Sequence, residues 1–147
     1  MREVLEAAET LVRDRLAAYG RGAARYGLIH ADMRLANLLI DGGDTRLIDF
    51  DDCGFGWFMY DFAAGISFME EHPQVPALRE AWLDGYRAVR PLDREDEVEI
   101  DSFIMLRRMA LLAWTGSHAG TDLARSQAPH FAAGTARLAE AYLARFA

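Results

Sequence analysis

Apolar residues recur every three or four positions through the first part of the chain, with charged residues between them. The apolar series consists of Leu5, Ala8, Val12, Leu16 and Tyr19. This spacing places one apolar stripe along an α-helix, and the glycines at positions 20 and 22 favour its termination. The pattern therefore predicts an amphipathic helix over residues 2–19.

Three short apolar runs come next, and turn residues separate them. They cover residues 28–29, 37–40 and 46–50. Each run is too short for a helix and is typical of a strand. The sequence DGGD, residues 41–44, joins the second and third runs and is typical of a hairpin turn. The sequence therefore predicts a small β-hairpin region after the first helix.

Helical periodicity returns after Phe55 and continues to the end of the chain. The predicted helices cover residues 61–71, 76–89, 93–117 and 129–146. Asp61, Pro76 and Asp93 are suitable capping or first-turn residues. The third of these helices is apolar on most sides, so we expect it to lie at the centre of the fold. The whole pattern predicts an α+β, mainly helical fold with a single domain over residues 1–147.

Composition and charge narrow the class of protein. With 52% hydrophobic residues, the chain can bury a core of ordinary size. Its 16 basic and 23 acidic residues give a net charge of −7, which argues against a nucleic-acid partner and favours cationic partners or metal ions. Cys53 is the one cysteine, so we expect no internal disulfide, and no run approaches the ~20 apolar residues of a membrane span. These features predict a cytoplasmic protein without a membrane partner.

Polar residues with the chemistry of an active site gather between positions 30 and 52. Asn37 begins one hairpin strand and Asp49 ends the opposite one, so hairpin closure brings the two side chains together. Amide and carboxylate oxygens suit Mg²⁺, and Asp32 on the preceding loop could accept a hydroxyl proton. The alternative interpretation is that these residues only form turns and bond their own backbone.

Three segments carry a specific resemblance, namely HADMRLAN at residues 30–37, LIDFDD at residues 47–52 and YDFA at residues 60–63. In this order they resemble the aminoglycoside phosphotransferase and choline kinase family. The resemblance implies the C-terminal lobe of a protein-kinase-like fold, with the catalytic loop on the small β-hairpin region. It also implies transfer of the γ-phosphate of ATP to a hydroxyl group of a small molecule, with Mg²⁺ as the cofactor.

The same resemblance implies roles for individual residues. Asp32 resembles the catalytic base, and Arg34 lies where kinases place a cation that meets the transferring phosphoryl group. Asn37 and Asp49 resemble the metal ligands, and Asp51 is expected to be an auxiliary acid at the metal.

Further residues are expected to support the site. By the resemblance, Leu39 and Ile48 line the adenine side of the ATP site, and His30 supports the loop as a hydrogen-bonding residue. Asp61 would hydrogen-bond the catalytic loop, although a plain helix cap is an equally good interpretation. The segment WTGSH, residues 114–118, either faces the acceptor pocket or ends the central helix with a core tryptophan.

Two parts of a kinase-like ATP site are not found in the sequence. All basic residues are arginines, so the lysine that holds the α and β phosphates is absent, and nothing before the first helix predicts a Gly-rich strand pair. Ala31 also replaces the glycine of the family motif. We therefore expect the N-terminal β-lobe to be absent and the isolated chain to be inactive. The chain could be an excised lobe, a truncated gene product or a chain that a partner completes, and the exposed apolar surface left by the missing lobe predicts self-association.

Two other functions and several acceptors remain open. LIDFDDC also resembles the nucleophile motif of haloacid-dehalogenase-type phosphatases, with Asp49 as nucleophile and Asp51 as acid, but that fold needs parallel βα units. The chain could also be a non-catalytic helical interaction module. The acceptor could be an amino sugar, a choline-like alcohol, a homoserine-like amino acid or a protein hydroxyl, and the acidic charge favours a cationic acceptor.

Overall fold

The computed structural model describes residues 1–147, except for the side chains of residues 127–129. The helices are α1 (Arg2–Tyr19), α2 (Tyr60–Gly65), α3 (Val75–Val89), α4 (Arg94–Ser117) and α5 (Asp122–Phe146). The strands are β1 (Tyr26–Ile29), β2 (Leu38–Asp41), β3 (Asp44–Leu47) and β4 (Gly54–Trp57), with a 3₁₀ turn at Leu35–Asn37. Within the described residues, no helix is both long and apolar enough to cross a bilayer.

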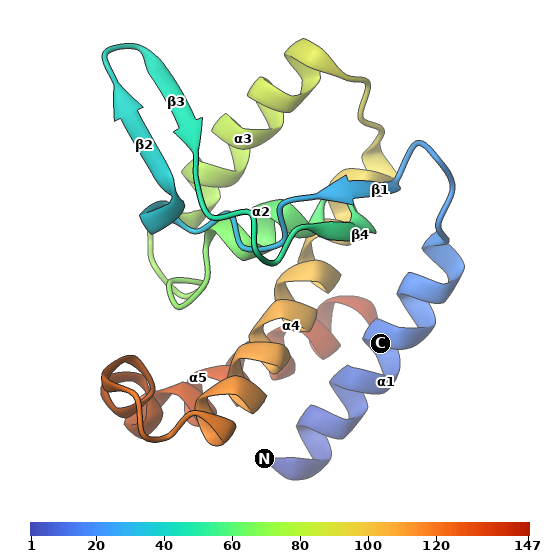
Figure 1. Ribbon diagram of the computed structural model, residues 1–147. Helices are drawn as coiled ribbons and strands as arrows, with labels where there is room; N and C mark the ends of the chain where they lie inside the picture. Colours follow the sequence, from blue (N-terminus) through green and yellow to red (C-terminus); the bar gives the residue numbers. More distant parts are fainter.

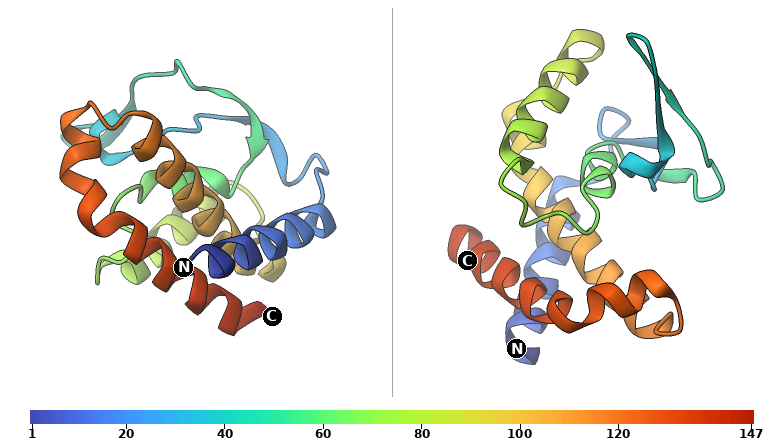
Figure 2. Two further views of the ribbon diagram at one scale, coloured as in Figure 1. Left: turned by 90° about the horizontal axis from the view of Figure 1, so that it is seen from below. Right: turned by 90° about the vertical axis from the view of Figure 1, so that its left-hand side faces the viewer.

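The helices and strands occupy different parts of the molecule. Helices α1, α4 and α5 pack against one another, and α2 packs against α4 (Figure 1). The hairpin of β2 and β3 projects from the body of the molecule, and both chain termini lie at the far end from it (Figure 2). The segments expected to carry the site therefore rest on a helical base.

The core forms where the apolar faces of α1 and α4 meet. The predicted face of α1 is confirmed, because its buried residues are Ala8, Val12, Leu16 and Tyr19. The central position of α4 is also confirmed by its buried apolar residues, which are Ile100, Phe103, Met105 and Leu111. Each large apolar side chain buried in this way contributes about 1.5–3 kcal/mol to folding. The β region contributes little to this core.

The strands pair as two separate antiparallel ribbons. The predicted hairpin is confirmed, with Leu38 opposite Leu47 and a left-handed Gly42 (φ 64°) in its turn. The second ribbon pairs β1 with β4, from Tyr26 opposite Trp57 to Ile29 opposite Gly54. Strand β4 was not predicted, because its sequence GFGW contains two glycines and no polar alternation. Strand β3 ends at Leu47, three residues before the predicted end of the third apolar run.

Two of the predicted helix boundaries were wrong. Helix α2 ends at Gly65 rather than at residue 71, and Phe68 just beyond it has φ 68°, a left-handed conformation that stops a helix. Helix α5 begins at Asp122, where the Thr121 hydroxyl accepts a hydrogen bond from the backbone N–H of Ala124. The start predicted at residue 129 falls among the residues whose side chains are not described. The predicted cap at Asp93 is confirmed as a capping box with Asp96.

Candidate active site

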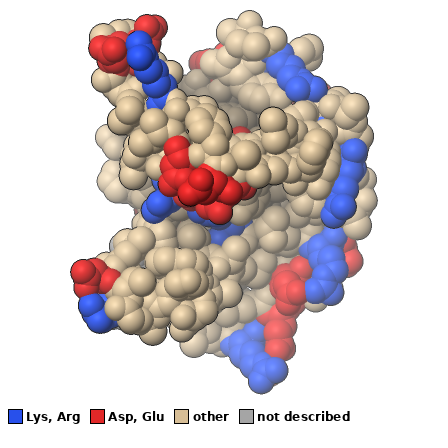
Figure 3. Space-filling model, viewed as in Figure 1, with Lys and Arg blue, Asp and Glu red and all other residues tan. Residues whose placement is uncertain are grey.

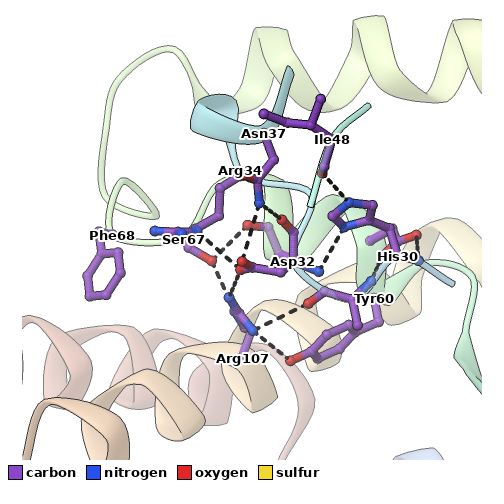
Figure 4. Close-up of polar contacts among 12 residues, drawn as sticks. His30, Asp32, Arg34, Asn37, Ile48, Tyr60, Ser67, Phe68 and Arg107 are labelled. Atoms are coloured by element: carbon purple, nitrogen blue, oxygen red, sulfur yellow. Dashed lines mark hydrogen bonds and ion pairs between the residues drawn. The ribbon is translucent and has the colours of Figure 1, made fainter. Parts of the chain in front are cut away.

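The loop between β1 and β2 is held in place by the ring of His30. Its Nδ1 accepts a hydrogen bond from the backbone N–H of Asp32 at 3.2 Å, and its Nε2 lies 2.9 Å from the carbonyl oxygen of Ile48. Since Nδ1 accepts, Nε2 carries the proton and donates it to Ile48. Both ring nitrogens are thus engaged with the backbone, as expected for a structural histidine (Figure 4).

Asp61 supports the same loop from helix α2. Its two carboxylate oxygens accept hydrogen bonds from the backbone N–H groups of His30 at 3.1 Å and Ala31 at 2.8 Å. Burial raises the pKa of Asp61, and these two hydrogen bonds oppose the shift. Ala31 has φ 67°, a conformation that costs about 1–2 kcal/mol for a residue other than glycine. Asp61 therefore binds the loop that follows β1, and the helix-cap interpretation does not describe it.

Asp32 lies at the centre of the polar contacts in Figure 4. Its Oδ1 accepts a hydrogen bond from Arg107 Nη2 at 2.9 Å. Arg34 Nε lies 3.1 Å from the same oxygen, close enough for an ion pair, but it makes no hydrogen bond with any described atom. Asn37 Nδ2 donates to the backbone oxygen of Asp32 at 2.8 Å and lies 3.4 Å from Oδ2. The structure thus brings together three of the residues that the sequence singled out.

Arg107 is a site residue that the sequence reasoning missed. It belongs to α4 and also contacts Ser67, Tyr60 and the backbone oxygen of Ala31. The prediction treated α4 as an apolar core helix, and Arg107 and Arg108 interrupt its apolar sequence. Two adjacent arginines inside such a helix require buried partners. That signal was available in the sequence, but it did not identify the partner.

A cavity of about 510 Å³ opens beside Asp32. Its lining includes Asp32, Arg34, Asp49, Asp52, Phe68, Arg107 and Trp114. Figure 3 shows acidic side chains gathered over the connection between β3 and β4, with basic side chains just below them and a hollow beneath. The Trp114 ring lies 6.3 Å from that of Phe68 and is stacked on His118 at 4.9 Å. Of the segment at residues 114–118, the tryptophan is therefore the part that reaches the cavity.

The three predicted metal ligands are not equally placed. Asp49 lines the cavity, whereas Asp51 is exposed and does not belong to its described lining. Asn37 is buried, and its amide nitrogen faces Asp32, so the amide oxygen is the atom left for an ion. Among the described side chains, no three His, Cys, Asp or Glu residues are grouped to hold a metal by themselves. One amide and one or two carboxylates still fit Mg²⁺, which takes its remaining ligands from water and phosphates.

The two predicted adenine contacts lie on the hairpin and face solvent. Leu39 is 49% exposed and Ile48 is 40% exposed. The backbone bond from Ile48 N–H to the Asn37 oxygen extends the ladder of β2 and β3 by one pair. Because side chains alternate along a strand, Leu39 and Ile48 lie on the same face of the hairpin. Contact of these side chains with adenine stays a prediction.

The fold and the site are those expected for a kinase-like phosphotransferase, and comparison with known protein families identifies the family of the chain. Residues 2–97 match the phosphotransferase enzyme family, so the chain belongs to that family. It is 39% identical over 75 residues to the homoserine kinase of Neisseria meningitidis serogroup B, a match that covers 48% of this chain and 25% of that protein. Members of this family are kinases with a protein-kinase-like fold.

Two solved structures resemble the chain along nearly its whole length. The structure of the microcompartment-associated aminopropanol kinase superposes with a TM-score of 0.90 and 47% identity, over 98% of this chain and 46% of that one. The structure of the amicoumacin kinase hAmiN in complex with AMP-PNP, Ca²⁺ and Ami superposes with a TM-score of 0.70 and 26% sequence identity. This match covers 95% of this chain and 44% of that one. The chain thus spans less than half of each of these proteins. The haloacid-dehalogenase-type phosphatase interpretation is rejected, because the chain resembles kinase structures and its strand pairs are antiparallel, whereas that phosphatase fold needs parallel βα units.

Proposed function

We propose that the chain is the acceptor-binding lobe of an ATP-dependent kinase that phosphorylates a hydroxyl group of a small molecule carrying an amino group. The observation that carries this proposal is the position of Asp32. Its side chain is 15% exposed, and it lines the cavity together with carboxylates and aromatic rings. A base in this position is shielded from bulk water and is still reachable from the cavity.

Asp32 acts as the base in the proposed reaction. It accepts the proton of the acceptor hydroxyl while the acceptor oxygen forms a bond to the γ-phosphorus of ATP. The bond between that phosphorus and the leaving oxygen of ADP breaks in the same step. Arg34 lines the cavity beside Asp32, and its guanidinium group is proposed to meet the negative charge of the transferring group.

Asn37, Asp49 and Asp51 are the proposed ligands of Mg²⁺. The bound ion would supply positive charge that neutralises part of the negative charge of the ATP phosphates. Leu39 and Ile48 are proposed to contact adenine from the hairpin face. The groups that hold the α and β phosphates are proposed to come from an N-terminal β-lobe, and the chain alone is proposed to be inactive. Phosphoryl transfer depends mainly on positioning and charge stabilisation, so losing those groups removes most of the rate.

An amino group in the acceptor fits the walls of the cavity. Asp52 supplies a carboxylate that the metal site does not use, and Phe68 and Trp114 supply aromatic faces. Ammonium groups bind carboxylates and the faces of aromatic rings. Two of the similar kinases are named after aminopropanol and homoserine, and each of these compounds carries an amino group and a hydroxyl group. These likenesses support a small amino alcohol as the acceptor.

The test is a phosphoryl-transfer assay with radiolabelled ATP and Mg²⁺. The chain is assayed alone and after fusion to the N-terminal β-lobe of the aminopropanol kinase. Aminopropanol, homoserine, choline and propanol serve as acceptors. We expect turnover only by the fusion, and faster turnover of aminopropanol than of propanol. Asp32→Ala should lower kcat by about 10²- to 10⁴-fold, the usual share of a positioned base.

Asp84→Ala is the matched control, because Asp84 is an exposed carboxylate on α3. It should leave kcat unchanged. Robust turnover by the chain alone would overturn the requirement for a second lobe. A folded fusion that transfers phosphate to none of the acceptors would favour the non-catalytic interaction module. Equal rates with propanol and aminopropanol would overturn the proposed recognition of an amino group.

A further inference from the structure

We propose that Arg107 is the positioning residue of the phosphotransfer site. Its guanidinium group holds one oxygen of Asp32 and thereby presents the other oxygen to the acceptor hydroxyl. Arg107 lies 75 positions after Asp32 and belongs to helix α4 rather than to the catalytic loop. The inference rests on the proposed function, because it assigns a partner to the base of that reaction.

The two carboxylate oxygens of Asp32 have different surroundings. Oδ1 accepts the 2.9 Å hydrogen bond from Arg107 and also has Arg34 Nε at 3.1 Å. Among the described side chains, Oδ2 accepts one hydrogen bond, from Asn37 Nδ2 at the long distance of 3.4 Å. A base needs an oxygen whose lone pairs are not already used by strong donors. The geometry therefore assigns acceptance of the hydroxyl proton to Oδ2.

Arg107 is itself fixed by three partners other than Asp32. Its Nε donates to Ser67 Oγ at 3.0 Å, and its Nη1 lies 3.3 Å from the Tyr60 hydroxyl and 3.5 Å from the Ala31 oxygen. A guanidinium group is planar, so these contacts determine the direction of Nη2 (Figure 4). Its side chain is only 15% exposed, which limits competition from water. A lysine could not satisfy all of these acceptors from one ammonium group.

The contacts of Arg107 connect three parts of the chain to the base. They reach the catalytic loop at Ala31, helix α2 at Tyr60 and the turn after α2 at Ser67. A guanidinium group donates hydrogen bonds and is not deprotonated in proteins. Arg107 therefore takes no part in the bond changes and acts through Asp32. Loss of this group should misorient the base without removing it.

The experiment compares Arg107→Ala, Arg107→Lys and the control Arg94→Ala in the fused enzyme. Arg94 is an exposed arginine at the first position of the same helix. We expect Arg107→Ala to lower kcat by roughly 10²-fold, the effect of misplacing a reacting group by about 1 Å, with little change in KM for ATP or the acceptor. Arg107→Lys should stay impaired, and added guanidinium ion should restore much of the activity of Arg107→Ala. Arg94→Ala should match the parent enzyme.

A double-mutant cycle with Asp32→Asn distinguishes positioning from direct catalysis. If Arg107 acts through Asp32, Arg107→Ala should not slow the Asp32→Asn enzyme further. An additional large loss in that background would overturn the proposal, because it would mean that Arg107 acts on the phosphoryl group or the acceptor directly. Full activity of Arg107→Ala, or of Arg107→Lys, would also overturn it.

A second measurement does not depend on the proposed reaction. In the 147-residue chain, Arg107→Ala should speed hydrogen exchange of the backbone N–H groups of residues 30–34 and leave the core of α1 unchanged. Unchanged exchange in the loop would overturn the positioning role even if the enzyme were active. Faster exchange in the loop together with an inert parent fusion would support the structural contact and reject the proposed function.

Discussion

At the scale of single residues, one carboxylate holds a strained part of the site. Ala31 adopts a left-handed conformation where the family motif has glycine, and Asp61 compensates by accepting the N–H groups of both Ala31 and His30. Backbone strain of this kind persists only where surrounding groups hold it. The orientation of Asp32, which follows Ala31 directly, thus depends on a residue of the next helix.

Replacing Asp61 by asparagine should therefore weaken the fold at the loop that follows β1. An amide has one oxygen acceptor and a nitrogen that donates, so one of the two backbone N–H groups would lose its partner. We expect the free energy of unfolding to fall by about 1–3 kcal/mol, the cost of an unsatisfied buried donor. Urea unfolding measures this change. Asp84→Asn, at an exposed position of α3, should leave the stability unchanged, and an equal effect of both variants would contradict the role of Asp61.

At the scale of elements, buried polar pairs determine how the helices meet. The hydroxyl of Tyr19 at the end of α1 donates to Asp96 in the first turn of α4, and Arg25 contacts both residues. Gly134 in α5 makes room for another polar contact, because a Cβ there would lie 2.7 Å from Arg108 Nη2. Arg108 of α4 in turn donates from Nε to the buried hydroxyl of Thr135 in α5 at 2.9 Å. Apolar faces bring these helices together, and such pairs fix their register.

The Tyr19 contact predicts a particular dependence of stability on alkaline pH. Burial raises the pKa of the Tyr19 phenol far above its ordinary value of 10, and the Asp96 carboxylate adds to the shift. The folded chain keeps this proton where the unfolded chain loses it. The stability from Tyr19 is therefore fully present below pH ~10 and falls by about 1.4 kcal/mol per pH unit above it.

Tyr19→Phe isolates this effect from those of other groups. Near pH 7 the variant should be less stable than the parent by about 1–3 kcal/mol, because it lacks a hydrogen bond to a charged group. Above pH ~10 the difference in unfolding free energy should shrink, since phenylalanine does not ionise. Denaturant unfolding at a series of pH values measures both the stability difference near pH 7 and its decrease above pH ~10. A difference that stays constant from pH 7 to 11 would contradict the assignment.

At the scale of the whole molecule, apolar exposure is concentrated in the segment that carries the site. Most exposed large apolar side chains lie between residues 28 and 55. They are Leu28, Leu35, Leu39, Ile40, Leu47, Ile48, Phe50 and Phe55. The chain also spans less than half of the similar kinases whose structures are solved. Because large exposed apolar patches are rare on monomers, this segment is expected to be covered by another lobe or another copy.

The isolated chain should therefore self-associate through this segment. Sedimentation velocity at increasing concentration should show species larger than a monomer. The double variant Leu39→Glu with Ile48→Glu should move the population towards monomer, because charged side chains oppose burial. Val89→Glu changes a side chain that is 90% exposed at the end of α3, and it should have no effect. A parent chain that stays monomeric at high concentration would show that the segment does not drive association.

The sequence by itself determined the features that depend on local order. Hydrophobic periodicity was enough to predict α1 and the central position of α4, and the DGGD turn was enough to predict the hairpin. The motif spacing also singled out Asp32 and Asn37, which the loop between β1 and β2 brings into contact. These features were predictable because each is encoded by residues close together in the chain.

Only the tertiary structure decided which distant residues complete the site. Strand β4 forms by pairing with β1, which lies more than 20 residues earlier in the chain, and its own sequence carries no strand signal. Arg107 could be recognised as a charge that needs a buried partner, but its contact with Asp32 depends on how α4 packs under the loop. The same packing brings Phe68 and Trp114 to one cavity. Hydrophobic periodicity in the sequence indicates which face of a helix or strand is buried. The partner of each buried charge depends instead on how elements far apart in the chain pack together.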